Sequence, residues 1–165
     1  MIGDEKMIIR RATRGDLDRV NSLLEQVLEI HASGRPDIFT HGTKKYSDDE
    51  LFEIFENEGT PVFVAQNSDG FVCGYAFCIV KITENNSILR DRRELYIDDL
   101  CVDETCRGQG IGRELFEYVE NYAKENGFDA ITLNVWSLNA SAMRFYEKCG
   151  FSPLKIIMEK PCNKA

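Results

Sequence analysis

Three glycines at alternate positions separate an apolar run from an amphipathic run in the segment "VDETCRGQGIGRELF", residues 102–116. Glycine is unfavourable inside a helix, so this repeat indicates that the backbone turns sharply or lies against another group. A strand that leads through such a turn into a helix presents unpaired N–H groups and the positive end of the helix dipole, which favour phosphate. The pattern therefore predicts a strand–loop–helix unit that either binds a phosphate or serves tight packing alone.

The spacing of these glycines excludes two common nucleotide-binding loops. A P-loop requires Gly-Lys-Ser/Thr, whereas this segment continues "GIGREL". The dinucleotide fingerprint G-x-G-x-x-G belongs to an early strand–helix–strand unit, and here the spacing is G-x-G-x-G late in the chain. Arg107, Gln109 and Arg113 are candidate side-chain donors to whichever phosphate the loop binds.

Hydrophobic periodicity predicts an α+β domain that spans residues 1–165. Strands are expected at 7–13, 61–66, 71–82, 94–102, 130–136 and 151–159. Helices are expected from Asp16 to about residue 31, from Ser47 to Gly59, from Ile111 to Gly127 and from Asn139 to Lys148. Gly34 and Pro36 predict a loop at 32–42, and Ser47 with Glu50 forms the pattern of a capping box.

Composition limits the classes of partner. The formal net charge of −8 disfavours binding to a nucleic-acid backbone. No apolar run approaches the roughly 20 residues of a membrane span, and charges interrupt the N-terminal segment where a signal peptide would be apolar. Six cysteines without a C-x2-C pair, together with two histidines, predict neither a disulfide framework nor a structural metal. A cytoplasmic protein that binds neither nucleic acid nor membrane is expected.

A second motif lies about 30 residues after the glycine loop. The segment "LNVWSLNASAMRFYEKCGF" contains Asn139, Ala142, Tyr146, Gly150 and Phe151. Together with the loop Arg107-Gly108-Gln109-Gly110-Ile111-Gly112, it resembles the GNAT superfamily of acyl-CoA-dependent N-acyltransferases, whose pyrophosphate loop is [RQ]-x-x-G-x-[GA]. The order of elements agrees with that family along nearly the whole chain.

The resemblance implies a mixed, mostly antiparallel sheet of six to seven strands flanked by about four helices. It also implies acetyl-CoA as cosubstrate and no metal. The backbone from Arg107 to Gly112, next to Arg113, would wrap the pyrophosphate, and the backbone of Leu100, Cys101 and Val102 would pair with pantetheine. Asn139, Ala142 and Tyr146 would contact the cofactor, and Asn139 would equally serve as a helix N-cap.

Acyl transfer to an amine needs a base for the ammonium proton and an acid for the departing thiolate. The resemblance places Tyr146 beside the thioester sulfur as the acid, with an aromatic core role as the alternative. Asp98 and Asp99 interrupt an apolar strand in "YIDDL", and either is a candidate base, acting directly or through water. Strand alternation puts the two carboxylates on opposite faces, and a structural salt bridge is the alternative for each.

The resemblance implies that the acceptor meets the first two helices and the loop between them. Asp37 could receive a cation, Arg35 a carboxylate, and Phe39 could form an apolar wall. Asn134, on the polar face of the fifth strand, could hold a relay water.

The leading hypothesis is an N-acetyltransferase whose partner is a small molecule with a primary amine. Acetylation of a protein or peptide, at its N-terminus or at lysine, and a non-catalytic CoA-binding regulatory module are the alternatives. The sequence leaves the oligomeric state open, with a homodimer as one option.

Overall fold

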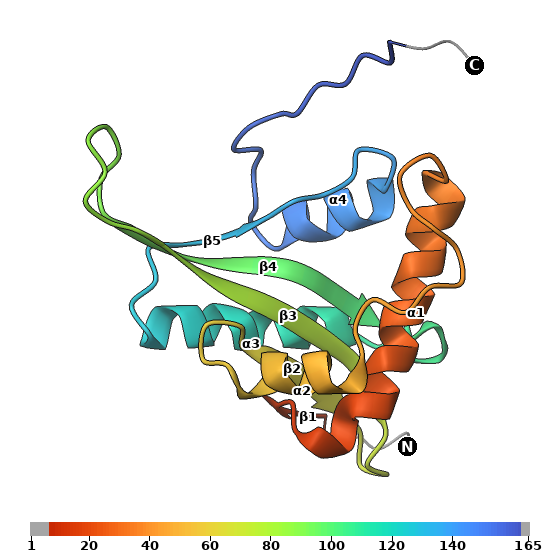
Figure 1. Cartoon of the computed structure of the whole chain (residues 1–165). Helices are drawn as coiled ribbons and strands as arrows, with labels where there is room; N and C mark the ends of the chain where they lie inside the picture. Colours follow the sequence, from red (N-terminus) through yellow and green to blue (C-terminus); the bar gives the residue numbers. More distant parts are fainter. Residues whose placement is uncertain (1–6, 163–165) are drawn as a thin grey trace. The chain divides into compact units, whose positions relative to one another are not determined.

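The computed structural model describes residues 7–162 and divides into two compact units, Met1–Asn134 and Val135–Ala165 (Figure 1). The first unit contains a sheet and the helices α1 (Leu17–Gly34), α2 (Asp48–Glu56) and α3 (Ile111–Glu125). The second unit contains α4 (Ala140–Lys148). Within residues 7–162, no helix is both long enough and apolar enough to cross a membrane.

The sheet of the first unit has five strands that follow one another in chain order. They are β1 (Ile8–Arg11), β2 (Val62–Gln66), β3 (Val72–Thr83), β4 (Arg92–Val102) and β5 (Ala130–Leu133). The first three pairings are antiparallel, and β5 returns parallel to β4 after the crossover through α3. The prediction of a mixed, mostly antiparallel sheet is therefore confirmed.

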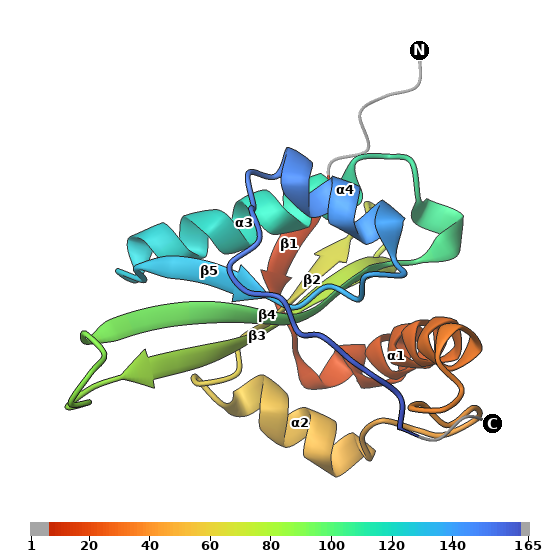
Figure 2. The same ribbon diagram turned by 90° about the horizontal axis from the view of Figure 1, so that it is seen from above.

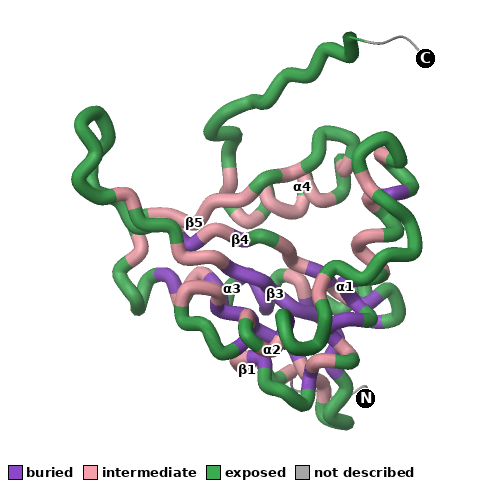
Figure 3. The backbone as a smooth tube through the Cα atoms, viewed as in Figure 1, coloured by how far each residue is buried: buried purple, intermediate pink, exposed green. Residues whose placement is uncertain are grey.

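Helices cover both faces of this sheet (Figure 2). On one face, Leu23 of α1 and Leu51 of α2 belong to the buried cluster that includes Val62 and Val64 of β2. On the other face, the Phe63 ring contacts the rings of Tyr118 and Tyr122 of α3 at centroid distances of 5.1 and 5.0 Å. The alternation of strand residues thus supplies two apolar layers. Figure 3 shows that β3 is buried along its first part and more exposed toward its end.

Local sequence sets the helix ends. Ser47 accepts a hydrogen bond from the Glu50 N–H while the Glu50 carboxylate accepts one from the Ser47 N–H, so the predicted capping box is confirmed. The first helix extends to Gly34, three residues beyond its predicted end. Its last turn carries the buried Ala32, and the helix stops at Arg35 because the residue before Pro36 is excluded from helical geometry.

The prediction of six to seven strands is wrong, since five are present in the part of the chain that the structure describes. The expected strand at 151–159 is irregular there, with Leu154, Ile156, Ile157 and Met158 between 75% and 86% exposed. An alternating sequence becomes a strand only where a neighbouring strand completes its hydrogen bonds, and residues 151–159 pair with none of the five. Pro153 also removes one N–H donor.

The fifth strand is shorter than the predicted 130–136. Its parallel pairing with β4 ends at Ile97↔Leu133, directly before β4 becomes irregular at Asp98. Asn134 therefore follows the strand instead of lying on its polar face, and the alternation argument does not apply to it.

Candidate active site

A β-bulge in β4 lies at the two strand carboxylates. Asp99 pairs with Phe77 and Ile97 pairs with Cys78, so Asp98 is an extra residue opposite the Phe77–Cys78 step. Consecutive strand residues such as Phe77 and Cys78 face opposite sides of the sheet. Their partners, Asp99 and Ile97, therefore also face opposite sides, although residues two positions apart in a regular strand share a side. The bulge interrupts the regular alternation from which opposite faces were predicted for the two acids.

Asp99 belongs to the face of the sheet that α1 and α2 cover. The Tyr75 hydroxyl, which is fully buried, donates a hydrogen bond of 2.6 Å to Asp99 Oδ2. Burial raises the pKa of the Asp99 carboxyl above its ordinary value, against the opposing effects of the Tyr75 hydrogen bond and the Lys45 charge. Asp99 is thus a partly buried acid with a fixed orientation.

Asp98 has a cationic partner that the sequence did not reveal. Lys45, from the loop between α1 and α2, places its Nζ 3.4 Å from Asp98 Oδ2, and the two side chains are 40% and 31% exposed. Burial alone lowers the pKa of the Lys45 ammonium, but the charges of Asp98 and Asp99 outweigh it and raise the pKa. A protonated amine therefore lies at the bulge in this structure.

The glycine loop begins five residues after Val102, the last residue of β4. Gly108 and Gly110 have φ values of +80° and +82°, which few other residues adopt, and a Cβ at either would meet no atom within 4 Å. Helix α3 follows at Ile111, and the Glu114 N–H donates to the Gly110 carbonyl. The N–H groups of the first helical turn have no carbonyl of the helix to pair with, so the open loop presents donors to an anion.

The charged side chains near this loop have protein partners. Arg107 Nε donates to the Val102 carbonyl at 3.1 Å, which ties the loop to the end of β4. Arg113 Nε donates to Glu117 Oε1 at 2.8 Å along α3. Gln109 is exposed. Backbone donors thus make up the core of this site, with Arg107 holding the loop in place.

The last residues of β4 have a strand partner on one side only. They pair with β3 through Gly74↔Val102, Tyr75↔Cys101 and Ala76↔Leu100. The pairing with β5 stops at Ile97, so the opposite edge of Leu100–Val102 has no strand beside it among the five strands. Gly74 brings β3 very close to β4, since a Cβ there would lie 2.6 Å from the Cys101 carbonyl oxygen.

A buried carboxylate joins α1 to the segment that leads into the loop. Asp103, 3% exposed, accepts hydrogen bonds from Arg19 and Gln26 of α1 and from the Thr105 N–H. These bonds lower the pKa of Asp103 although burial alone would raise it. The sequence carried no signal for this contact beyond an acid at the end of a strand, because Arg19 and Asp103 are 84 positions apart.

The second unit contains the other predicted motif. Asn139 Oδ1 accepts a hydrogen bond of 3.1 Å from the Ala142 N–H, so the N-cap role of Asn139 is present. The Tyr146 ring contacts those of Phe145 and Phe151 at centroid distances of 5.1 and 5.6 Å. Tyr146 remains partly exposed, and its role as acid stays a prediction.

The predicted acceptor residues pair largely among themselves. Arg35 Nε and Nη2 donate to the two carboxylate oxygens of Asp37 at 2.8 and 2.7 Å. The Phe39 ring lies 5.1 Å from the His31 ring. Burial raises the pKa of the Tyr96 phenol. A hydrogen bond with the Asn134 side chain acts in the opposite direction and lowers this pKa. Lys45, from the same loop between α1 and α2, reaches Asp98 on β4.

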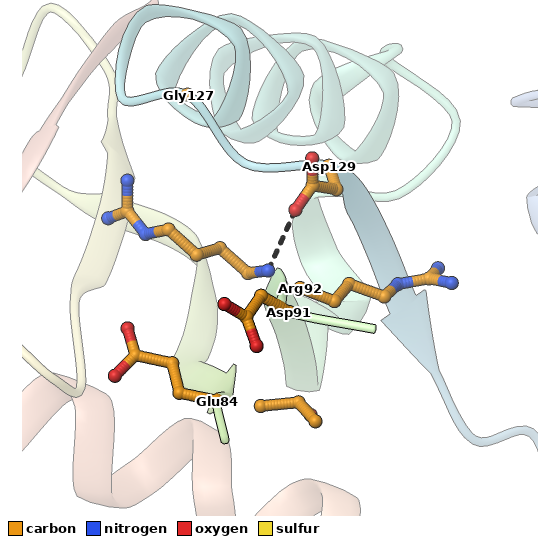
Figure 4. Close-up of a pocket in the computed structure, with 7 residues that line it drawn as sticks. Glu84, Asp91, Arg92, Gly127 and Asp129 are labelled. Atoms are coloured by element: carbon orange, nitrogen blue, oxygen red, sulfur yellow. Dashed lines mark hydrogen bonds between the residues drawn. The ribbon is translucent and has the colours of Figure 1, made fainter. Parts of the chain in front are cut away.

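One pocket lies away from these residues, where β3 ends and β4 begins (Figure 4). Its lining residues are Thr83, Glu84, Asp91, Arg92, Arg93, Gly127 and Asp129. The Arg93 N–H donates a 2.8 Å hydrogen bond to Asp129 across it. Strand β4 has 11 residues at about 3.3 Å each, so this pocket and the glycine loop flank opposite ends of the strand. No group of three or more potential metal ligands is present among residues 7–162.

Comparison with solved structures shows a similar fold. A mutant of the BH1408 protein from Bacillus halodurans is 35% identical, with a TM-score of 0.91 over 94% of this chain and 99% of that one. An aminoglycoside N-acetyltransferase in complex with CoA, at 15% identity, has a TM-score of 0.73 over 99% of each chain and shares the fold.

Comparison with curated proteins finds named acetyltransferases. A probable N-acetyltransferase from Drosophila melanogaster, san, is 36% identical over 64% of this chain and 54% of its own length. The streptothricin acetyltransferase of Streptomyces lavendulae is 33% identical over 64% of this chain and 52% of its own length. The chain thus spans about half the length of these two relatives. The model of the acetyltransferase (GNAT) family matches residues 24–151, which include the strand acids, the glycine loop and α4, and the chain belongs to this family.

Proposed function

We propose that the protein is an acetyl-CoA-dependent N-acetyltransferase that moves an acetyl group to the primary amine of a small molecule. The observation that carries this proposal is the arrangement along β4. A bulge with two carboxylates, an unpaired strand edge and an anion-binding loop follow one another within the span from Asp98 to Gly112. Family membership supports acetyl-CoA as the donor.

The residues present fit the binding of acetyl-CoA. The loop from Arg107 to Gly112 offers backbone N–H groups and open space above Gly108 and Gly110, where a Cβ would otherwise approach the phosphate oxygens. The free edge of Leu100–Val102 offers backbone groups to the amides of pantetheine. Bound acetyl-CoA supplies an activated acetyl group as a thioester. This binding mode relies on backbone groups, which suits a site with few unpaired cationic side chains.

Asp98 receives the ammonium proton of the acceptor in this proposal, and Asp99 is the alternative base. An alkylammonium has a pKa of about 10, so it must lose a proton before its nitrogen attacks. Asp98 is the direct base, because it is the more accessible acid and already holds an ammonium 3.4 Å away. Asp99 accepts the Tyr75 hydrogen bond, and its negative charge adds to the attraction for a cation.

Tyr146 donates the proton that the departing thiolate takes up. The tyrosine lies seven residues after Asn139, so both side chains project from one face of α4. Contacts with Phe145 and Phe151 restrict the orientation of the Tyr146 ring.

A small-molecule acceptor is supported by the streptothricin acetyltransferase, which is 33% identical over the matched segment. The strand acids favour an acceptor that is cationic before it reacts. Arg35 and Asp37 neutralise each other, so their substrate-binding role requires the acceptor to break or bridge that pair.

The test is the release of free CoA thiol from acetyl-CoA with a panel of polyamines, amino acids, aminoglycosides and peptides. Turnover with at least one small amine is expected. Turnover with peptides alone would contradict the small-molecule acceptor. Tight CoA binding without acetylation of any added amine or of the protein itself would identify a CoA-binding module instead of an enzyme.

A further inference from the structure

An ammonium group of the chain itself lies beside Asp98, the carboxylate that the proposed reaction uses as its base. Lys45 Nζ lies 3.4 Å from Asp98 Oδ2, within the range of an ion pair. Asp99 is also close enough for its charge to act on Lys45, so the ammonium lies in the field of both strand acids. The Lys45 side chain stays 40% exposed and can therefore be reached by a second reactant.

We propose that Lys45 is a site of self-acetylation, in which the protein transfers an acetyl group from acetyl-CoA to the Nζ of its own lysine. The inference rests on the proposed acetyltransferase function and names an acceptor within the chain. It requires no substrate other than acetyl-CoA.

The chemistry balances with groups already assigned. Asp98 takes one proton from the Lys45 ammonium, and the free amine attacks the acetyl carbonyl carbon. The new N–C bond forms as the C–S bond breaks. The nitrogen then loses a second proton, and CoA gains one as a thiol. Asp98 returns the first proton to solvent, so the reaction as a whole releases one proton. The product is an uncharged acetyl-lysine, which leaves Asp98 without its cation.

The neighbouring lysine provides a matched control. Lys44 Nζ lies 2.8 Å from Asp48 Oδ1 at the start of α2, and its side chain is 47% exposed. Lys44 and Lys45 thus share sequence context, exposure and a carboxylate partner, but only the partner of Lys45 lies on β4. Uncatalysed chemical acetylation would modify both, whereas a directed reaction selects Lys45.

The experiment incubates the full chain with acetyl-CoA and follows the modification of each lysine by peptide mass spectrometry. We expect Lys45 to be acetylated at least about tenfold faster than Lys44, with a rate constant independent of protein concentration because the reaction is intramolecular. Lys45→Arg should abolish the rapid modification, and Lys44→Arg should leave it. Asp98→Asn should slow it about 100-fold or more.

A second readout does not depend on transfer. Because the Asp98 charge raises the pKa of the Lys45 ammonium, Asp98→Asn should lower that pKa in an NMR titration of labelled lysines. An unchanged pKa would show that the ion pair does not form in solution and would overturn the inference.

The outcomes separate this inference from the proposed function. If small amines are acetylated while Lys45 and Lys44 react at equal slow rates, self-acetylation is wrong and the acetyltransferase function stands. If neither amines nor Lys45 are acetylated, both are wrong. Rapid modification of Lys45 in a protein that acetylates no external amine would support the inference. It would contradict the proposal that the acceptor is a small molecule.

Discussion

Arg19 of α1 and Asp103, the first residue after β4, form an ion pair in which Arg19 Nη2 lies 2.5 Å from Asp103 Oδ2. The carboxylate side chain is 5% exposed and the arginine side chain 23%. Arg19 also donates to the Val72 carbonyl at 3.0 Å, and its guanidinium lies 4.2 Å from the centre of the Phe71 ring. The pair therefore ties α1 to the start of β3 and to the approach to the glycine loop.

Asp103→Asn should lower the free energy of unfolding at pH 7 by about 1–3 kcal/mol, because it leaves a partly buried arginine without its charge partner. The loss corresponds to roughly 2–4 °C in Tm per kcal/mol for a chain of this size. Chemical denaturation of both proteins measures it. Glu120→Gln, which breaks the exposed pair with Lys124, is the control and should change little.

The same pair gives a defined pH dependence. The pKa of Asp103 is lower in the folded state than in the unfolded state, where it is about 4. The ionised carboxylate therefore stabilises the fold fully above about pH 4, and this stabilisation is lost as the pH falls toward the pKa of the folded state. The stability difference between wild type and Asp103→Asn should therefore be constant from about pH 5 to 8 and shrink below about pH 4. A difference that persists undiminished in acid would contradict the charge-based explanation.

Local patterns predicted the helix starts and the glycine loop, because these depend on residues within one turn of each other. The capping box at Ser47 and the start of α3 at Ile111 are examples. The bulge at Asp98, the ion pair of Lys45 and the contact of Arg19 with Asp103 depend on segments between 19 and 84 positions apart in sequence. No local pattern encodes such pairings, since they arise from the register of the sheet and the packing of α1. The absent strand at 151–159 has the same origin, because alternation does not specify a partner.

Gly110→Asp should weaken acetyl-CoA binding by placing a carboxylate beside the pyrophosphate. The substitution also imposes backbone strain, because φ at this position is +82°. Gly70→Asp, in the β2–β3 turn at φ +83°, imposes a similar strain away from the loop and is the matched control. Calorimetry should show a loss of CoA affinity of about tenfold or more in Gly110→Asp and none in Gly70→Asp. Equal CoA affinity in the two folded variants would refute the loop assignment.

Asp99→Asn should raise stability at neutral pH. The folded pKa of Asp99 is raised, so the folded state binds its proton more tightly and wild-type stability falls as the pH rises from about 4 through the folded pKa. Asparagine removes the charge and can still accept the Tyr75 hydrogen bond. We expect a gain on the order of 1 kcal/mol, about 2–4 °C in Tm, at pH 7–8. The gain should vanish below about pH 4, and a variant less stable than wild type at pH 7 would show that burial of the charge is not costly.

Asp98→Asn should reduce kcat/KM for the amine acceptor by about 100-fold or more, because the direct proton acceptor is lost. The affinity for acetyl-CoA should remain within about twofold of the wild-type value, since Asp98 precedes the free strand edge at Leu100–Val102 that we propose for the cofactor. Asp69→Asn, in the exposed turn between β2 and β3, is a control for charge removal. A larger loss in Asp99→Asn than in Asp98→Asn would transfer the role of base to Asp99.

Tyr146→Phe should lower kcat by about 10- to 100-fold and leave acetyl-CoA affinity nearly unchanged, because only the proton donor to the thiolate is removed. Phenylalanine preserves the ring contacts with Phe145 and Phe151, so the fold of the second unit should be retained. Circular dichroism checks folding, calorimetry measures CoA affinity and thiol release measures kcat. Phe145→Tyr places a hydroxyl one residue earlier on α4 and should not restore activity in the Tyr146→Phe background, since the two side chains point about 100° apart around the helix. A folded Tyr146→Phe enzyme with wild-type kcat, or one that loses CoA binding, would show that the hydroxyl is not the acid.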